Sequence, residues 1–266
     1  MNPRMLLPLF PFLLLALPMG CTGTDKGETG EPADTDTDTD TDTDTDTDTD
    51  TDTDTDPGPS EAVGTMYFAD FGTGTPLEGV SVSAAGDTFL SDVTGATALS
   101  IPKDVTTELQ ITLAGYMPTY LSLSADATSD WVLSFGLASS ALVGAVEGAF
   151  GITYDPSLST VIVAVQELDD KGGWRTAGGA TVNLDVAYQG GVSRGPDGFV
   201  PSTTLVADGG NFVAFANVAV GTVNVTVTPA NGETCTTAPS TTRADLTVTT
   251  RADSLSSVIV RCYPAE

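Results

Sequence analysis

The sequence predicts an all-β protein with two small β-sandwich domains behind a disordered linker. From residue 57 onward the chain is rich in Val, Thr, Gly, Ser and Ala, a composition that suits strands better than long helices. Apolar and polar residues alternate in short segments, as in residues 109–113 and 223–227, and this period of two indicates strands with one buried face. Clusters of Gly, Asp, Pro and Ser separate the segments and predict turns.

Residues 1–20 have the pattern of a secretory signal peptide, with a positive charge near the N-terminus and an apolar run at residues 5–17. The run is too short to span a bilayer comfortably, because a transmembrane helix needs about 20 apolar residues. Gly20 and Cys21 follow it and resemble the lipobox of bacterial lipoproteins, although Pro18 stands where that family favours leucine.

The resemblance to a lipobox implies that Cys21 is acylated and anchors the chain to a membrane. Thr22 follows the cysteine, and the lack of aspartate there resembles the sorting signal of outer-membrane lipoproteins. We therefore expect the protein at the outer membrane or cell surface. The alternative is an ordinary signal peptide with an incidental cysteine.

Residues 35–56 form eleven consecutive Thr-Asp pairs within a linker that we assign to residues 21–59. As a strand, this tract would carry aspartates about 7 Å apart on one face, inside the Debye length of about 8 Å, so the charges would repel. Thr and Asp are weak helix formers, and without large apolar residues the tract cannot offset the entropy of ordering. We predict a disordered, extended acidic spacer. A specific calcium site is the alternative, but calcium loops need a glycine turn and a distal carboxylate that the tract lacks.

The acidic charge limits the partners. The formal net charge is −27, and from residue 57 onward 21 acidic residues still face seven basic ones. Such a surface repels phosphate backbones and anionic lipid headgroups. The charge therefore argues against nucleic acid as a partner.

The first predicted sandwich covers residues 60–138. Its strand candidates have one apolar face; Leu109 and Ile111, for example, alternate with Gln110 and Thr112. Seven short strands in this length are typical of a small β-sandwich. The candidates are residues 63–69, 79–83, 88–90, 96–101, 109–113, 119–123 and 131–135.

Three motifs of this unit resemble the carboxypeptidase regulatory-like family of transthyretin-like sandwiches. Residues 75–82, Thr-Pro-Leu-Glu-Gly-Val-Ser-Val, resemble its opening strand, and residues 92–95, Asp-Val-Thr-Gly, resemble its Asp-x-x-Gly turn. Residues 114–116, Ala-Gly-Tyr, resemble its Gly-Tyr pair before a late strand. The resemblance implies a β-sandwich with an accessory role, sometimes with carbohydrate contact, and no catalytic residues.

The second predicted sandwich covers residues 139–266. Residues 178–182 and 217–221 are loosely similar to the same family's early strand and its Asn-Val-x-x-Gly turn, whereas the insertion at residues 190–207 is long. The two units are divergent copies or, alternatively, the second is another immunoglobulin-like sandwich. Its strand candidates are residues 142–146, 160–165, 181–188, 211–215, 222–228, 244–249 and 257–262.

The chain has three cysteines. If Cys21 carries lipid, Cys235 and Cys262 remain as an even pair in an exported chain, where disulfides persist. Cys262 is in phase with the apolar residues of its strand and should point inward. A disulfide would close a loop of about 28 residues and stabilise the fold by roughly 3.5 kcal/mol. A metal site or a nucleophile is the alternative, but the chain has no histidine to complete either.

No constellation of catalytic residues is evident. The lack of histidine removes the commonest general base and metal ligand. The three lysines, Lys26, Lys103 and Lys171, lie in the tail, at a strand end and in a predicted hairpin turn. No glycine-rich phosphate loop opens a helix. We predict a non-enzyme without metal or other cofactor; a hydrolase that uses a pair of Asp or Glu carboxylates is the alternative.

Aromatic residues supply the candidate ligand contacts. Trp174 and Arg175 lie in a glycine-flanked turn at residues 172–179, where an exposed tryptophan would stack on a sugar ring or a partner. Phe199, in the long insertion, is a further candidate. Local packing is the alternative for all three residues, and Trp131, in phase with the apolar residues of its strand, is expected in the core.

The sequence therefore predicts a lipid-anchored envelope protein that presents two β-sandwich modules on an acidic stalk. Its role would be structural or ligand-binding, with carbohydrate or an envelope protein as the partner.

Overall fold

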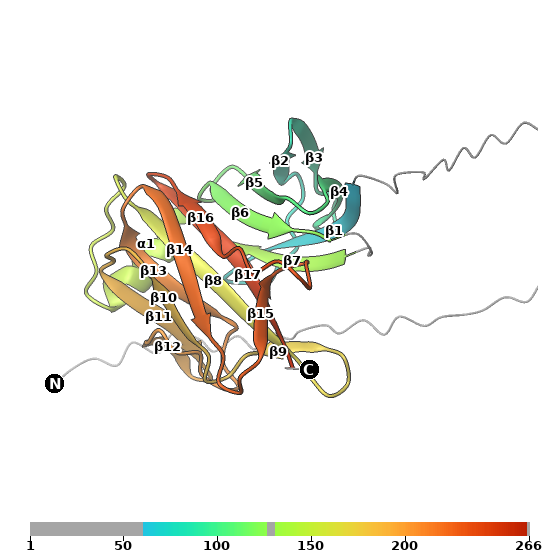
Figure 1. Cartoon of the computed structure of the whole chain (residues 1–266). Helices are drawn as coiled ribbons and strands as arrows, with labels where there is room; N and C mark the ends of the chain where they lie inside the picture. The colour runs from blue at the N-terminus through green and yellow to red at the C-terminus, as the bar shows by residue number, and fades with distance from the viewer. Residues whose placement is uncertain (1–60, 127–130, 265–266) are drawn as a thin grey trace, which may run out of the picture. The chain divides into compact units, whose positions relative to one another are not determined.

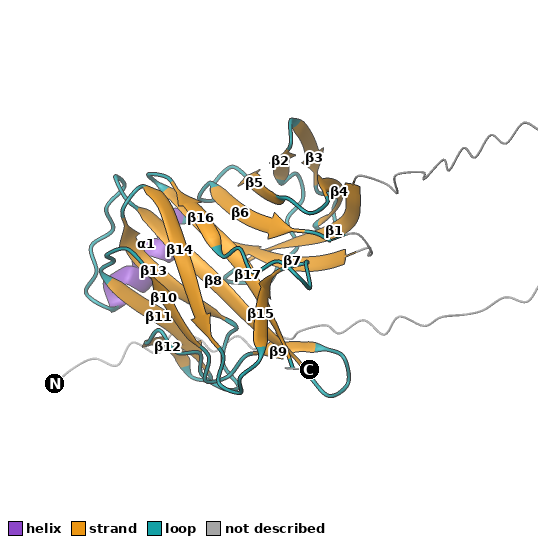
Figure 2. Ribbon diagram, viewed as in Figure 1, coloured by secondary structure: helices purple, strands orange, loops and turns teal. Residues whose placement is uncertain are grey.

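The computed structural model describes residues 61–126 and 131–264, and strands are the main regular structure of this part of the chain, with one helix (Figure 2). The all-β class is therefore confirmed. The signal peptide, Cys21 and the Thr-Asp tract lie outside the described residues. The elements are β1 Glu61–Asp70, β2 Ser81–Ala84, β3 Asp87–Leu90, β4 Ala96–Pro102, β5 Thr106–Thr112, β6 Thr119–Ser124, β7 Trp131–Leu137, α1 Ser140–Ala149, β8 Ser159–Leu168, β9 Trp174–Thr176, β10 Thr181–Leu184, β11 Gly190–Gly195, β12 Gly198–Pro201, β13 Phe212–Val218, β14 Gly221–Thr228, β15 Thr234–Thr237, β16 Thr247–Thr250 and β17 Ser254–Tyr263.

The first half of the fold, β1 to β7, consists of two facing sheets. One sheet has the order β4-β1-β7, with β1 antiparallel to β4 and parallel to β7. The other contains β3, β2, β5 and β6 in that spatial order. Met66 and Phe68 of β1 belong to the same buried cluster as Leu109 and Ile111 of β5. The apolar face that alternation predicts on each strand therefore closes a sandwich core.

The second half, β8 to β17, repeats this connectivity. Its first strand, β8, is antiparallel to β13 and parallel to the last strand, β17, just as β1 relates to β4 and β7. Strands β10, β14 and β16 form the facing sheet. Val163 of β8 and Val258 of β17 share a buried cluster with Val182 of β10 and Val225 of β14. The two halves thus share the order β4-β1-β7 and β13-β8-β17 in one sheet and the order β2-β5-β6 and β10-β14-β16 in the other. Strand β3 is additional in the first half, and β9, β11, β12 and β15 are additional in the second.

The repeat extends to individual backbone hydrogen bonds. In the first half, Phe68 donates its N–H to the carbonyl of Gly95 at 2.8 Å and accepts a bond from the N–H of Leu77 at 3.0 Å. The equivalent position of β8 makes the same pair of bonds. They run from the N–H of Val165 to the carbonyl of Asn211, 2.6 Å, and from the N–H of Ala177 to the carbonyl of Val165, 3.3 Å.

Three of the motif glycines are required by the backbone. Gly79 and Gly179, before β2 and β10, both have a positive φ, at +73° and +84°. Gly95 has a φ of +79°, and a Cβ there would lie 2.3 Å from the carbonyl oxygen of Phe68. Each of these positions therefore favours glycine.

A single sheet passes from one half into the other (Figure 1). Strand β6 of the first half pairs in parallel with β17 of the second, from Leu255 opposite Thr119 to Val258 opposite Ser122. Because β17 also pairs with β8, the sheet continues without a break across both halves. Ala238 and Ile259 of the second half belong to the buried cluster of the first half. The halves therefore share backbone pairing and part of one core.

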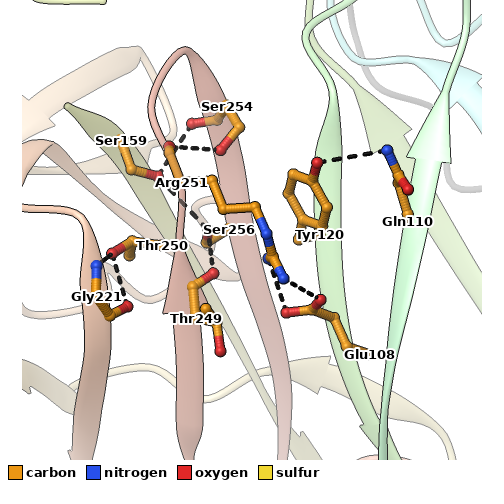
Figure 3. Close-up of polar contacts among 10 residues, drawn as sticks. All are labelled: Glu108, Gln110, Tyr120, Ser159, Gly221, Thr249, Thr250, Arg251, Ser254 and Ser256. Carbon is orange, nitrogen blue, oxygen red and sulfur yellow. Dashed lines mark hydrogen bonds and ion pairs between the residues drawn. The ribbon is translucent and has the colours of Figure 1, made fainter. Parts of the chain in front are cut away.

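Polar contacts reinforce this junction (Figure 3). The guanidinium of Arg251, in the turn between β16 and β17, donates to both carboxylate oxygens of Glu108 on β5, at 2.9 and 2.6 Å. The same guanidinium lies 3.9 Å from the ring centroid of Tyr120 on β6. On the far side of the turn, Ser254 and Ser256 donate to the carbonyls of Arg251 and Thr249. The turn that carries Arg251 is thereby held from both sides.

One predicted strand is wrong. Residues 142–146 lie in helix α1, whose N-cap, Ser139, accepts a hydrogen bond from the N–H of Leu142 at 3.2 Å. Leu142, Val143 and Val146 are spaced three and four residues apart, which suits one face of a helix better than the alternation of a strand. The remaining strand candidates of both halves overlap observed strands.

Candidate functional site

Trp174 lies on strand β9, which pairs with β8. The residues after the predicted hairpin turn form this short strand instead of continuing the turn, because Leu168 and Trp174 pair across the hairpin. The guanidinium of Arg261 lies 4.3 Å from the Trp174 ring centroid, and Tyr263 meets the indole edge-on at 5.3 Å. Trp174 is half-buried in this group. The indole is therefore packed against Arg261 and Tyr263 and remains partly exposed.

Arg175 forms an ion pair with a buried carboxylate. Its Nε lies 2.8 Å from Glu167, whose side chain is 8% exposed, whereas that of Arg175 is 62% exposed. Burial raises the pKa of Glu233, and the nearby negative charge of Glu167 raises it further. The Oε2 of Glu233 is buried without a hydrogen-bond partner.

The predicted disulfide is confirmed. Cys235 and Cys262 are joined across the pairing of β15 with β17, and Cys262 is completely buried, as its phase predicts. Arg261 is the neighbour of Cys262 in β17, so the two side chains point to opposite faces of the sheet. The disulfide thus ties β15 to the strand that carries Arg261 and Tyr263.

Phe199 does not join the Trp174 group. It lies on β12, contacts Phe212 edge-on at 6.2 Å, and lines a cavity of about 60 Å³ between α1 and the strands β8, β11, β12 and β13. Neither Trp174 nor Arg175 lines this cavity. The candidate contacts therefore fall into two places, a group around Trp174 and a cavity that includes Phe199.

Sequence reasoning missed the one carboxyl group in the cavity wall, Glu147. This residue of α1 is 4% exposed, and its Oε1 accepts a hydrogen bond from the hydroxyl of Thr160 at 3.1 Å. Its Oε2 is buried and has no hydrogen-bond partner. Burial raises the pKa of Glu147, and the bond from Thr160 offsets this only in part. A helical reading of residues 140–149 would have placed Glu147 beside Val143 on the apolar face.

Metal-binding groups and membrane-spanning helices were predicted to be absent, and both can be assessed only in the described residues. Within residues 61–126 and 131–264, no group of three or more His, Cys, Asp or Glu side chains could hold a metal ion. In the same residues no helix is long and apolar enough to cross a membrane. Cys21, the predicted lipidation site, lies outside the described part of the chain.

Comparisons with known proteins leave the family open. No family model and no curated protein matches the chain. Among solved structures, the chain is similar to GBS52, the minor pilin of Streptococcus agalactiae, at 11% identity and a TM-score of 0.28, over 77% of this chain and 97% of that one. It is also similar to the Bacillus anthracis TIE protein, at 10% identity and a TM-score of 0.26, over 77% of this chain and 34% of that one. The shaft pilin spaA from Lactobacillus rhamnosus GG gives 11% identity and a TM-score of 0.23, over 77% and 98% of the two chains. The chain spans about a third of the TIE protein, and TM-scores this low establish no common function.

Proposed function

We propose that this chain is an exported, lipid-anchored protein of the cell envelope that acts as a structural or binding module without catalysis. The observation that carries the proposal is the Cys235–Cys262 disulfide, because disulfides persist in oxidising compartments outside the cytosol. The signal-like residues 1–20 and the lipobox-like Gly20-Cys21 agree with export. The site of action would be the outer membrane or cell surface.

The acidic linker would act as a stalk between the anchor and the sandwiches. The residues between Cys21 and the first strand would span at most about 120–130 Å if fully extended. Charge repulsion along residues 35–56 favours an extended chain, so its reach should shrink as salt screens the aspartates. The junction of β6 with β17 would let the stalk present both sandwiches as one body.

We assign the two modules to residues 60–138 and 139–266 and relate both to the carboxypeptidase regulatory-like family. The shared order of paired strands and the positive-φ glycines at residues 79 and 179 support this relation. The ligand would be a carbohydrate or an envelope protein bound beside Trp174, since a partly exposed, rigid indole suits stacking on a sugar ring.

A glycan array and a pull-down with the purified whole chain test the binding function. We expect saturable binding without turnover, and we expect Trp174→Ala to weaken it by about tenfold, because one stacked aromatic contributes roughly 1 kcal/mol or more. Tyr67→Ala is the matched control, since Tyr67 is 41% exposed on β1 in the other half. Equal loss in both variants would contradict a site at Trp174, and turnover of a glycan or peptide would support the hydrolase alternative instead.

A further inference from the structure

Strand β17 carries an arginine, Arg261, where the sheet also contains β15, β8 and β9. In this part of the sheet β17 pairs with β15 on one side and with β8 on the other, and β9 pairs with β8 (Figure 1). Arg261 is directly opposite Thr236 of β15 and Gln166 of β8. Because residues opposite each other point the same way, these three side chains share one face of the sheet.

The carboxylates of the neighbouring strands point away from Arg261. Glu167 follows Gln166 in β8, so it lies on the other face, where it pairs with Arg175 at 2.8 Å. Glu233 is close enough to Glu167 for their charges to interact and belongs to that other group. No ion pair between described residues includes Arg261. Its guanidinium therefore has no counter-ion in the part of the chain that the structure describes.

The guanidinium of Arg261 is half-buried, and its outer end is accessible. Burial lowers the pKa of Arg261, but an arginine stays charged at neutral pH. Nε is enclosed without a hydrogen-bond partner, whereas Nη1 and Nη2, which donate to no described residue, are not enclosed. A half-buried charge without a counter-ion is costly, and the Trp174 ring at 4.3 Å offsets only part of that cost. A carboxylate would supply the missing charge, because its two oxygens match two N–H groups of a guanidinium.

The surroundings of the guanidinium favour a sugar with a single negative charge. The partly exposed indole of Trp174 lies against Arg261, so a ring-sized ligand that reaches Nη1 and Nη2 also meets the indole. Thr234 of β15 is exposed on the same face, opposite Tyr263, and offers a hydroxyl. The charge of Asp126 reaches Tyr263, and the surface as a whole is acidic. Each further negative charge on the ligand would therefore be repelled, which disfavours a polyanion.

We propose that the ligand bound beside Trp174 is a glycan with a single hexuronate, whose carboxylate accepts hydrogen bonds from Nη1 and Nη2 of Arg261 while the sugar ring contacts the indole. This inference rests on the binding function proposed for Trp174 and names the class of ligand. The binding is non-covalent. Stacking on Trp174 fixes the plane of the guanidinium before the ligand arrives, so less conformational entropy is lost on binding.

An NMR titration of the ¹⁵N-labelled whole chain with methyl glucuronide and methyl glucoside tests the proposal without any variant. The chain has two tryptophans, so it has two indole N–H signals. The signal of Trp174 should shift to saturation, whereas that of Trp131, whose Nε1 is buried, should not change. We expect the glucuronide to bind about tenfold or more tightly than the glucoside, as expected for hydrogen bonds between charged groups.

A pair of arginine variants assigns the charge. Arg261→Met removes the guanidinium and keeps an unbranched stem, so it should weaken glucuronide binding about tenfold or more and change glucoside binding less than about threefold. Arg251→Met is the matched control. Arg251 also stacks on an aromatic ring, 3.9 Å from the centroid of Tyr120, but it is already paired with Glu108. This control should leave both affinities unchanged.

The outcomes separate this inference from the proposed function. Equal affinity of the wild type for the two sugars, or unchanged glucuronide affinity in Arg261→Met, would overturn the inference and leave carbohydrate binding at Trp174 in place. If neither sugar shifted the Trp174 signal, carbohydrate binding there would be wrong, and the inference with it. Equal binding of N-acetylglutamic acid amide would identify an acidic peptide as the ligand and would also overturn the inference.

Discussion

The two halves of the molecule have the same topology but fill it with different side chains. At one equivalent pair of the parallel strands, the first half has Gly64 opposite Trp131, whereas the second has Val161 opposite Ser256. A Cβ on Gly64 would lie 2.0 Å from the Trp131 ring, so the small residue and the large one require each other. The comparison shows that the strand order and register are kept while the two residues of a cross-strand pair differ in how they divide the available volume.

Exchanging this pair should give the largest effect. Trp131→Ser removes a buried indole and should lower the free energy of unfolding by about 3–5 kcal/mol, the cost of truncating a buried Trp. Gly64→Val alone should be severely destabilising, because its side chain would overlap the indole. In the double variant, the loss in free energy of unfolding should be smaller than the sum of the two single losses by roughly 0.5–3 kcal/mol. Urea denaturation of all four proteins measures the coupling, and strictly additive effects would contradict the volume exchange.

The disulfide distinguishes the second half from the first. Removing it with Cys235→Ser and Cys262→Ser should lower the free energy of unfolding by about 3.5 kcal/mol, because the open chain gains loop entropy when unfolded. Thermal melts with and without reductant provide the measurement, and the double serine variant, which has no disulfide to lose, is the control. Equal melting of wild type in both conditions would show that the bond contributes nothing.

The ion pair at the junction should have a smaller effect. Arg251→Met should cost about 0.5–1 kcal/mol in low salt and less at high salt, because both side chains are about a third exposed. Arg175→Met is the matched control, since its pair with Glu167 lies outside the junction. If the loss from Arg251→Met did not change with salt, the contribution would come from packing on Tyr120 instead of charge.

The smallest effect should be a pH dependence at Asp126, which follows β6 and accepts hydrogen bonds from Thr241 in the loop after β15. Burial raises the pKa of Asp126, but hydrogen bonds from Thr241 and Ser240 outweigh it, so the pKa lies below the ordinary value of 3.8. A carboxyl group with a lowered pKa stabilises the fold above pH 3.8, and this contribution is lost as the pH falls through the folded-state pKa.

Wild type should therefore exceed Asp126→Asn in stability at neutral pH, with the gap closing below about pH 4. Denaturation midpoints between pH 3 and pH 7 measure this gap. Asp87→Asn, at the exposed first residue of β3, is the control. A gap that widens towards low pH would contradict the sign of the shift.

Much of the fold could be predicted because the alternation of apolar and polar residues along a strand indicates which of its faces is buried. The alternation of residues 109–113 and the phase of Cys262 predicted buried faces that the structure shows. The Asp169 turn was also predicted, and its carboxylate accepts from the N–H groups of Lys171 and Gly173. Such signals are local, so one residue and its neighbours are enough to show them.

The parts that could not be predicted depend on contacts far apart in the chain. Nothing near Thr119 indicates that β6 pairs with Leu255 and its neighbours, because parallel pairing between two sandwiches has no local pattern. Glu147 was missed because residues 142–146 of helix α1 were predicted as a strand. That strand ended before Glu147, so the prediction gave no face for its carboxyl group. The short strand β15 has only four residues and depends on its partner β17.

The central claim is that pairing of β6 with β17 makes the two halves one folding unit. The chain has two tryptophans, Trp131 in the first half and Trp174 in the second. Trp174→Phe and Trp131→Phe therefore leave one fluorescent reporter for each half. In urea denaturation of each variant, fluorescence and far-UV circular dichroism should give one coincident transition with the same midpoint. Separate transitions, with the Trp131 signal changing at a urea concentration where the second half remains folded, would contradict the claim.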